Sequence, residues 1–209
     1  MSEVLPAFIP PNAVENPKRR KMLIAGTSAL AGAGAVMAGF PFVASWQPSE
    51  RAKAIAAPVE VDISQLEVGA LLTVLWQGKV VFILKRSPEM LESLNKVKDF
   101  LRDPDSKESS QPEKLTAPAR AIKEDILVML GICTHFGCAP SMHNAVEGKA
   151  AFGDNSWEGG FFCACHGSKF DYSGRVYKGV PAPTNLTIPP YRFKSDTVII
   201  IGEEETQNG

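Results

Sequence analysis

The chain has 209 residues, 44% of them hydrophobic, which is enough for one globular domain with some length left over. The formal net charge is −1 and is unevenly divided: residues 1–53 carry six Lys and Arg against three Asp and Glu, a balance of +3, so residues 54–209 stand at −4. This mildly acidic main portion argues against nucleic-acid binding, which would favour a basic face.

The first predicted element is an apolar helix. Residues 22–43 contain no charged side chain, and as a helix they would extend about 33 Å, close to the thickness of the hydrocarbon core of a bilayer. We therefore predict one transmembrane anchor over residues 22–46, with Trp46 at the membrane interface. The basic run Lys18 to Lys21 stands immediately before it. The positive-inside rule then predicts a cytoplasmic segment over residues 1–21 and delivery of everything after the anchor to the opposite side.

The paired Arg19 and Arg20 resemble a twin-arginine export signal. Lys18 and Met22 depart from that motif, which usually has Ser or Thr and Phe at these positions. Two other interpretations stay open: the basic run could serve only the positive-inside rule, or the segment could be a signal peptide cleaved near the small residues at 52–54. The uncharged stretch of 22 residues exceeds the usual apolar core of such peptides, which favours a retained anchor.

Residues 47–58 are small and polar without a clear apolar period, which predicts a flexible tether that reaches at most about 40 Å. Strand-type patterns follow: one strand over 59–63, and a hairpin over 71–85 that turns at Gln77 and Gly78. The head domain is therefore predicted to begin at residue 59 and to extend to residue 209.

One helix interrupts the strand patterns of the head. Ser87 and Pro88 provide an N-cap and a first helical position, and apolar residues then recur at helical spacing, which predicts a helix that ends near Arg102. Residues 103–120 are predicted to be a loop. Further strands are predicted at 126–132 and near 168–172, 175–178, 187–193 and 197–201. This pattern predicts a mainly β head with one inserted helix, and assigns no element to the insert 139–162.

All four cysteines and all three histidines fall between residues 133 and 166. Cys133 and His135 stand on one predicted loop, and Cys163 and His166 on another, each pair two or three residues apart. Four such ligands from two loops suit either a tetrahedral zinc ion or a two-iron cluster. His143 has no partner at ligand spacing and is assigned no function.

The two motifs, CTHFGC at 133–138 and CACHGS at 163–168, resemble the signature of Rieske iron-sulfur proteins. From the basic flank to the last strands, the chain resembles the Rieske subunit of the proteobacterial cytochrome bc complex, a ubiquinol-cytochrome c reductase. This resemblance implies a Rieske-type antiparallel β head domain after a single N-terminal transmembrane helix. It also implies one [2Fe-2S] cluster per chain, held by loops 133–140, 163–168 and 179–183.

Carried over by motif position, the resemblance implies that Cys133 and Cys163 bind one iron while His135 and His166 bind the other, as is general for Rieske centres. Two neutral imidazoles in place of two thiolates leave the oxidised cluster neutral rather than dianionic, so that it accepts an electron more readily. The imidazoles also carry titratable protons, which couples electron uptake to proton uptake.

The other two cysteines, Cys138 and Cys165, are implied by the resemblance to form a disulfide. Such a bond would close a loop of about 27 residues and contribute roughly 3.5 kcal/mol by the chain-entropy estimate. It persists only in an oxidising compartment, which agrees with export of the head.

The resemblance also assigns roles to residues around the cluster. Ser168 would donate a hydrogen bond to a bridging sulfide, whereas Phe170 stands where the family has a Tyr that donates to a cysteine sulfur. The missing hydroxyl predicts a lower midpoint potential. Phe136, where Leu is common, would face the quinol pocket from the apolar rim. The remaining cofactor-binding residues would lie in the cluster loops and in the Pro-rich loop that covers the cluster: Gly137, Gly167, Pro181 and Pro183.

The function implied is that of the electron-transfer subunit of a respiratory quinol:cytochrome c oxidoreductase. Quinol bound in a cytochrome b partner would give one electron to the cluster and a proton to a ligand histidine, with His166 and His135 as the catalytic residues. The head would swing on its tether and pass the electron to a membrane-anchored c-type cytochrome. The complex is expected to be dimeric and to lie in the bacterial inner membrane, with the head in the periplasm.

Other function classes stay open from the sequence. The Rieske small subunit of a periplasmic molybdenum oxidase, such as arsenite oxidase, would also carry an export signal, but it would not need an anchor of bilayer length. A Rieske ferredoxin or oxygenase domain typically lacks the second cysteine pair and any export segment. A zinc-stapled binding module would be colourless and redox-silent.

Overall fold

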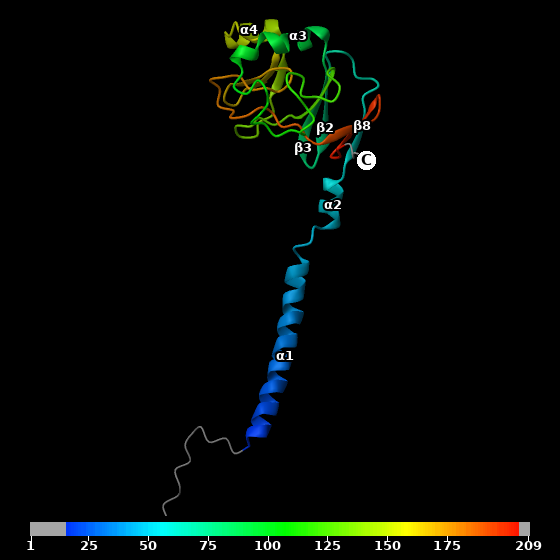
Figure 1. Cartoon of the computed structure of the whole chain (residues 1–209), viewed down its shortest axis with the longest axis vertical. Helices are drawn as coiled ribbons and strands as arrows, with labels where there is room; N and C mark the ends of the chain where they lie inside the picture. The colour runs from blue at the N-terminus through cyan, green and yellow to red at the C-terminus, as the bar shows by residue number, and fades with distance from the viewer. Residues whose placement is uncertain (1–15, 205–209) are drawn as a thin grey trace, which may run out of the picture. The chain divides into compact units, whose positions relative to one another are not determined.

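The computed structural model describes residues 16–204 (Figure 1) and divides into two compact units, with the boundary between Ala52 and Lys53. Residues 1–15 of the predicted cytoplasmic segment and residues 205–209 of the predicted head lie outside the described residues. Each unit is described by itself below.

The N-terminal unit contains the helix α1, Pro17–Ala44. Asn16 caps it, because its side chain accepts a hydrogen bond from the backbone N–H of Arg19 at 3.1 Å, and Pro17 takes the first helical position. These start signals explain why the helix begins five residues before the predicted anchor at 22–46. The mean hydropathy of its most apolar window is 1.6, and within residues 16–204 it is the one helix long and apolar enough to cross a membrane.

A short helix, α2 (Glu50–Ala56), lies inside the segment that we expected to have no regular structure. Ser49 begins it by accepting a hydrogen bond from the backbone N–H of Ala52 at 3.2 Å. Its composition of Ala, Glu, Arg and Lys has a high intrinsic helix propensity. The prediction overlooked this helix because all its residues are exposed and form no apolar stripe.

The head is mainly antiparallel β, as predicted, and has three sheets of three strands each within the described residues. In the order in which the strands pair, the sheets are β1 (Val59–Asp62), β9 (Val198–Ile201) and β8 (Tyr191–Ser195); β2 (Leu71–Trp76), β3 (Lys79–Lys85) and β4 (Ile126–Leu130); and β5 (Ser141–His143), β6 (Gly160–Cys163) and β7 (Ser168–Phe170).

The strand predicted near 187–193 begins only at Tyr191 and extends to Ser195. Two other predicted elements of the head differ from the structure. The helix α3, Pro88–Lys96, ends before Arg102, and a 3₁₀ turn, Lys98–Phe100, follows it. The predicted strand at 175–178 is replaced by isolated bridges, one of them between Leu101 and Tyr177. The same contact explains both differences, because pairing of Leu101 with a segment far along the chain requires extended backbone where the helical period would continue.

The insert 139–162, to which we assigned no element, contains β5, most of β6 and the helix α4, Ala145–Phe152. Asn144 caps α4 by accepting a hydrogen bond from Glu147 N–H at 2.9 Å, and Gly153 ends it with a left-handed φ of 62°. These cap residues were readable from the sequence. Within the insert, the fully buried Trp157 donates its indole N–H to the carbonyl of Asn144 at 3.1 Å. Its ring stacks on that of Tyr177 with centroids 5.8 Å apart, which holds the insert on the rest of the head.

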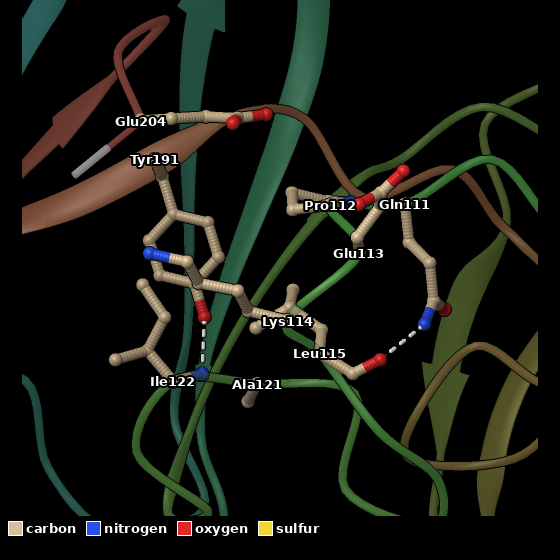
Figure 2. Close-up of a pocket in the computed structure, with 9 residues that line it drawn as sticks. All are labelled: Gln111, Pro112, Glu113, Lys114, Leu115, Ala121, Ile122, Tyr191 and Glu204. Atoms are coloured by element: carbon tan, nitrogen blue, oxygen red, sulfur yellow. Dashed lines mark hydrogen bonds between the residues drawn. The ribbon is translucent and has the colours of Figure 1, made fainter. Parts of the chain in front are cut away.

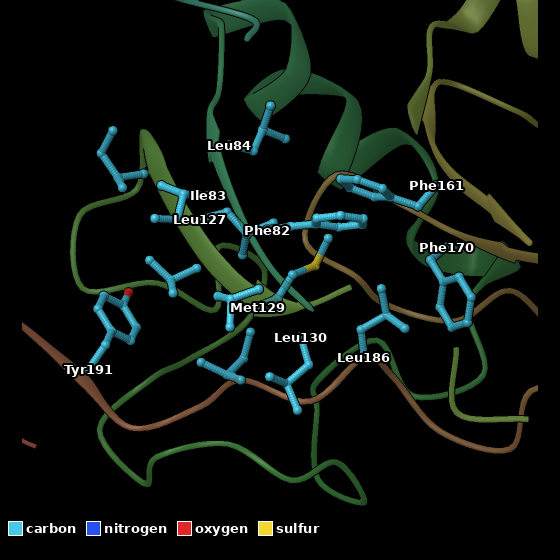
Figure 3. Packing of buried hydrophobic residues seen from close by; sticks show 14 of the residues in the cluster. Phe82, Ile83, Leu84, Leu127, Met129, Leu130, Phe161, Phe170, Leu186 and Tyr191 are labelled. Atoms are coloured by element: carbon cyan, nitrogen blue, oxygen red, sulfur yellow. The ribbon is translucent and has the colours of Figure 1, made fainter. Parts of the chain in front are cut away.

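The main hydrophobic core takes buried residues from all three sheets, among them Phe82 of β3, Met129 of β4, Phe161 of β6, Phe170 of β7 and Tyr191 of β8 (Figure 3). The rings of Phe82 and Phe161 stack across it with centroids 5.7 Å apart. Cys133 and Cys163 belong to the same buried cluster of residues. The core therefore anchors the start of both cysteine-containing loops, while the loops themselves reach the surface.

Candidate metal centre

The first loop leaves the core directly after β4 and closes on itself. The backbone N–H of Cys133 donates to the carbonyl of Cys138 at 2.8 Å, and the N–H of Gly137 donates to the carbonyl of Cys133 at 2.9 Å. Gly137 has a φ of 84°, which a residue with a side chain rarely adopts. The tight turn places Cys133 in the core and exposes Phe136 at its tip.

The second loop connects β6 to β7. Cys163 and Ser168 are the last paired residues of the two strands, and the N–H of Gly167 donates to the carbonyl of Cys163 at 2.9 Å. Gly167 also has a left-handed φ, 77°. The hairpin thus buries Cys163 and leaves Cys165 and His166 exposed.

A third loop, 179–183, closes against the other two. Ser168 Oγ accepts a hydrogen bond from the N–H of Ala182 at 3.0 Å, and Thr134 Oγ1 donates to the carbonyl of Thr184 at 2.7 Å. Both contacts join residues far apart in the sequence, and the sequence interpretation missed Thr134 and Ala182. The expected lining residues Pro181 and Pro183 are exposed, whereas Ala182 between them is buried against Ser168.

Of the four residues that the motifs single out, the structure brings the two histidines together and buries the two cysteines. The imidazole rings of His135 and His166 lie edge to face with centroids 4.7 Å apart, and Cys133 and Cys163 are free cysteines that are each 2% exposed. Nδ1 of His135 is buried and has no hydrogen-bond partner within the described residues. A buried polar atom without a partner destabilises the folded state, and such atoms are therefore rare. A metal bound at this nitrogen would satisfy it, so two thiols and an unsatisfied imidazole nitrogen fit a metal group.

Burial raises the pKa of the Cys133 thiol, and the neighbouring Cys163 raises it further, while hydrogen bonds from the backbone of His135 and from Ser168 oppose the rise. By itself this thiol therefore resists ionisation. A bound cation reverses that preference, because a coordinating thiol gives up its proton. The site is thus organised to hold cysteine sulfur on a metal rather than as a free thiolate.

Cys138 and Cys165 form a disulfide with their Cα atoms 6.7 Å apart, the pairing that the family resemblance implies. The sulfur atoms of Cys138, Cys163 and Cys165 all lie within 4.8 Å of one another. This group of three is not itself a thiolate metal site, because the disulfide uses two of its sulfurs. It does show that the disulfide fastens the two loops together directly beside the buried Cys163.

Two aromatic residues flank these groups. Phe136 is 77% exposed, and its ring centroid lies 4.0 Å from that of His135 and 5.9 Å from that of His166. Phe170 is fully buried on β7, opposite Phe161. Phe136 therefore forms an apolar rim beside the two imidazoles, and Phe170 belongs to the core behind the hairpin.

The remaining candidates lie elsewhere. His143, which was assigned no function, contacts Ser141 on β5 and the ring of Phe152 on α4. A cavity of about 510 Å³ lies between the loop 111–122 and β8 (Figure 2). In it Tyr191 Oη accepts a hydrogen bond from Ile122 N–H at 2.8 Å, and burial raises the pKa of Tyr191 to about 12. None of the residues that line this cavity was a predicted site residue.

Comparison with known proteins agrees with this geometry. Residues 98–191 match the family model described as Rieske [2Fe-2S] domain. Residues 10–49, which include Arg19 and Arg20, match the model described as Ubiquitinol-cytochrome C reductase Fe-S subunit TAT signal. The cofactor of the chain is therefore a Rieske [2Fe-2S] cluster, and the zinc alternative is not supported.

Two curated relatives are similar over nearly their whole length, and both are named ubiquinol-cytochrome c reductase iron-sulfur subunit. The protein from Allochromatium vinosum is 51% identical over 189 residues, which cover 90% of each chain. The protein from Bradyrhizobium diazoefficiens is 39% identical over 192 residues, which cover 91% of this chain and 98% of that one. The chain thus belongs to the Rieske iron-sulfur subunits of the ubiquinol-cytochrome c reductases.

Proposed function

We propose that Cys133 and Cys163 hold one iron of the cluster and His135 and His166 the other, and that the histidine pair receives quinol. The observation that carries this proposal is the unsatisfied, buried Nδ1 of His135 beside the ring of His166 and the two buried free cysteines. The cluster, when bound, supplies a one-electron acceptor whose uptake of an electron is coupled to proton uptake by its imidazoles.

His166 is the residue that meets quinol first. It is exposed, whereas His135 is half-buried, so its outer nitrogen Nε2 is the more accessible hydrogen-bond partner for a quinol hydroxyl. Nε2 would accept that hydrogen bond and then hold the proton. Phe136 and the Pro-rich loop 179–183 provide the apolar surface around it, which would exclude water while the hydrogen bond is made.

Other features of the chain support a role for this site between two partners. The apolar helix and the twin-arginine signal indicate membrane anchoring with a translocated head. The basic run at 18–21 supports a cytoplasmic N-terminus and a periplasmic head. Quinol would be bound in a cytochrome b subunit of a dimeric complex, and the electron would pass to a membrane-anchored c-type cytochrome. Residues 47–58 would act as the tether between the two positions.

The test is low-temperature EPR spectroscopy on membranes that contain the full chain. A rhombic Rieske signal after mild reduction with ascorbate would support a high-potential cluster that accepts electrons from quinol. A signal that requires dithionite would instead indicate a low-potential carrier and contradict the proposal.

Two histidine variants make the assignment specific. His166→Gln should abolish the signal, because one iron loses a ligand. His143→Gln is the matched control, since the imidazole of His143 contacts Ser141, Phe152 and Phe162, all within the insert, and it should keep the signal. Retention of the signal in His166→Gln would refute the ligand assignment.

A further inference from the structure

Arg86 is a buried guanidinium of which one edge has no hydrogen-bond partner. Its side chain is 2% exposed, and Nη1 donates to the carbonyls of Ala119 and Tyr172 at 2.9 and 3.4 Å and to Oγ of Ser173 at 2.7 Å. Nε and Nη2 are buried and have no partner among the described residues. These two nitrogens share one edge of the planar group, from which two N–H bonds point the same way. Arg86 thus presents a bidentate donor edge that nothing in the described chain satisfies.

Two further guanidiniums lie close to Arg86, and we call the three the arginine group: Arg86, Arg120 and Arg175. All three side chains are at most 2% exposed. Burial lowers the pKa of Arg120 to about 10, an effect that Asp171 opposes. The positive charges of Arg175 and Arg86 lower that pKa further. The arginine group therefore holds like charges that repel one another away from water.

The buried carboxylates do not balance the charge of the arginine group. Among the described residues, the buried charged side chains are its three arginines and two aspartates, Asp103 and Asp171. Asp171 pairs with Arg175 at 2.7 Å, and Asp103 accepts hydrogen bonds from its own loop. The hydrogen bonds that Arg86 and Arg120 donate within the described chain all end on uncharged oxygen atoms. One buried positive charge is therefore left without a counter-ion, which destabilises the folded state unless an anion approaches it.

A cavity of about 300 Å³ beside the helix α3 adjoins the arginine group. Ala119 lines it, and the carbonyl of Ala119 accepts from Arg86. Leu94 also lines it, and the carbonyl of Leu94 accepts from Nη2 of Arg175 at 2.6 Å. The lining includes two exposed acidic residues, Glu92 and Glu124. Water and salt screen exposed carboxylates, so their charge does not keep a small anion from space that lies one layer from the arginine group.

We propose that the Nε and Nη2 edge of Arg86 binds a small monovalent anion. Water would satisfy the two donors, but only an anion also balances the excess positive charge of the arginine group. A chloride ion between the two N–H bonds, or a carboxylate-like anion with one oxygen on each, matches this edge. The opposite side of the guanidinium holds Ser173 in the turn after β7. Anion binding therefore stabilises the part of the head that supports the second cluster loop.

The test is urea unfolding of the full chain in detergent at constant ionic strength, with chloride as the probe. Chloride replaces gluconate stepwise, because gluconate has the same charge and is too large for a buried site. An anion that binds only the folded chain lowers the unfolding equilibrium constant by about tenfold for each tenfold rise in its concentration above the dissociation constant. We expect this dependence in the unsubstituted chain. Equal stability in chloride and in gluconate would overturn the inference.

Two variants locate the effect. Arg86→Met removes the donor edge and should make the unfolding equilibrium constant the same in chloride and in gluconate. Arg192→Met is the matched control, because Arg192 pairs with Glu203 on the partly exposed sheet of β8, and it should keep the full chloride dependence. A dependence that persists in Arg86→Met would place the anion elsewhere and overturn the assignment. The iron ligands take no part in this measurement, so its outcome is independent of the cluster assignment.

A second measurement applies if Arg86→Met does not fold. Crystals of the unsubstituted full chain soaked in bromide should show an anomalous diffraction peak within hydrogen-bond distance of Nε and Nη2 of Arg86. An ordered water molecule at this edge, or the carboxylate of Glu124 turned onto it, would overturn the inference.

Discussion

Replacement of Asp171 by Asn should lower the free energy of unfolding of the head by more than the loss of an exposed ion pair would. Asp171 follows β7, and its carboxylate forms a salt bridge with the guanidinium of Arg175 at 2.7 Å, with both side chains 1% exposed. One carboxylate oxygen also accepts hydrogen bonds from the backbone N–H groups of Ser173 and Arg175 at 2.9 and 2.8 Å. This single buried carboxylate therefore fixes the turn that leads away from the second cluster loop.

The expected loss of stability follows from the buried charge that the substitution leaves without a partner. Asn keeps the size of Asp but removes the charge, so that Arg175 remains buried without its counter-ion. Two more buried guanidiniums, those of Arg86 and Arg120, donate to Ser173 in the same turn at 2.7 and 2.8 Å. Burial lowers the pKa of each to about 10, and Asp171 is the largest charge that opposes this. Loss of one partner of a buried pair costs about 3–5 kcal/mol, or roughly 6–20 °C in Tm for a domain of this size.

The assay is urea unfolding of the full chain in detergent, followed by circular dichroism. Glu203→Gln is the matched control, because Glu203 pairs with Arg192 at 2.8 Å while their side chains are 42% and 31% exposed, and such a pair is worth at most about 1 kcal/mol. If Asp171→Asn costs no more than this control, the buried carboxylate does not hold the turn and the reasoning is wrong.

Substitutions around the cluster loops test three more expectations. Phe170→Tyr supplies a hydroxyl on a fully buried ring and should raise the midpoint potential by about 20–60 mV in a redox titration; no rise would contradict a donor role at this position. Joint replacement of Cys138 and Cys165 by Ala opens a loop of 27 residues and should lower the free energy of unfolding by about 3.5 kcal/mol, which an unchanged urea midpoint would contradict. Burial alone would raise the pKa of Asp154, but hydrogen bonds from Lys169 and from Ser156 hold that pKa below its usual value. Stability should therefore be lost as the pH falls below about 4 through the folded pKa, and Asp154→Asn should remove that part of the pH profile.

Local sequence determined much of this protein. The uncharged stretch at 22–43 predicts the apolar helix, and the two Cys and His motifs predict the loops, since a ligand pair two or three residues apart needs only one turn to converge. Start signals such as Ser87 and Pro88 gave the correct beginning of α3, because caps depend on neighbours within four residues. The caps of α4 were equally local and could have been read from the sequence.

Which atoms of the site are buried was determined only by the tertiary structure. The hydrogen bond between Ala182 and Ser168 joins residues 14 positions apart in the sequence, and the one between Thr134 and Thr184 joins residues 50 positions apart. No local sequence pattern predicts such contacts. The burial of His135 Nδ1 likewise depends on how the loops pack together. The same holds for the end of α3, where pairing with a distant segment overrides the helical period. Spacing along the chain determines which residues can share a loop, whereas burial and the partners of each polar atom depend on contacts between segments that are far apart in the sequence.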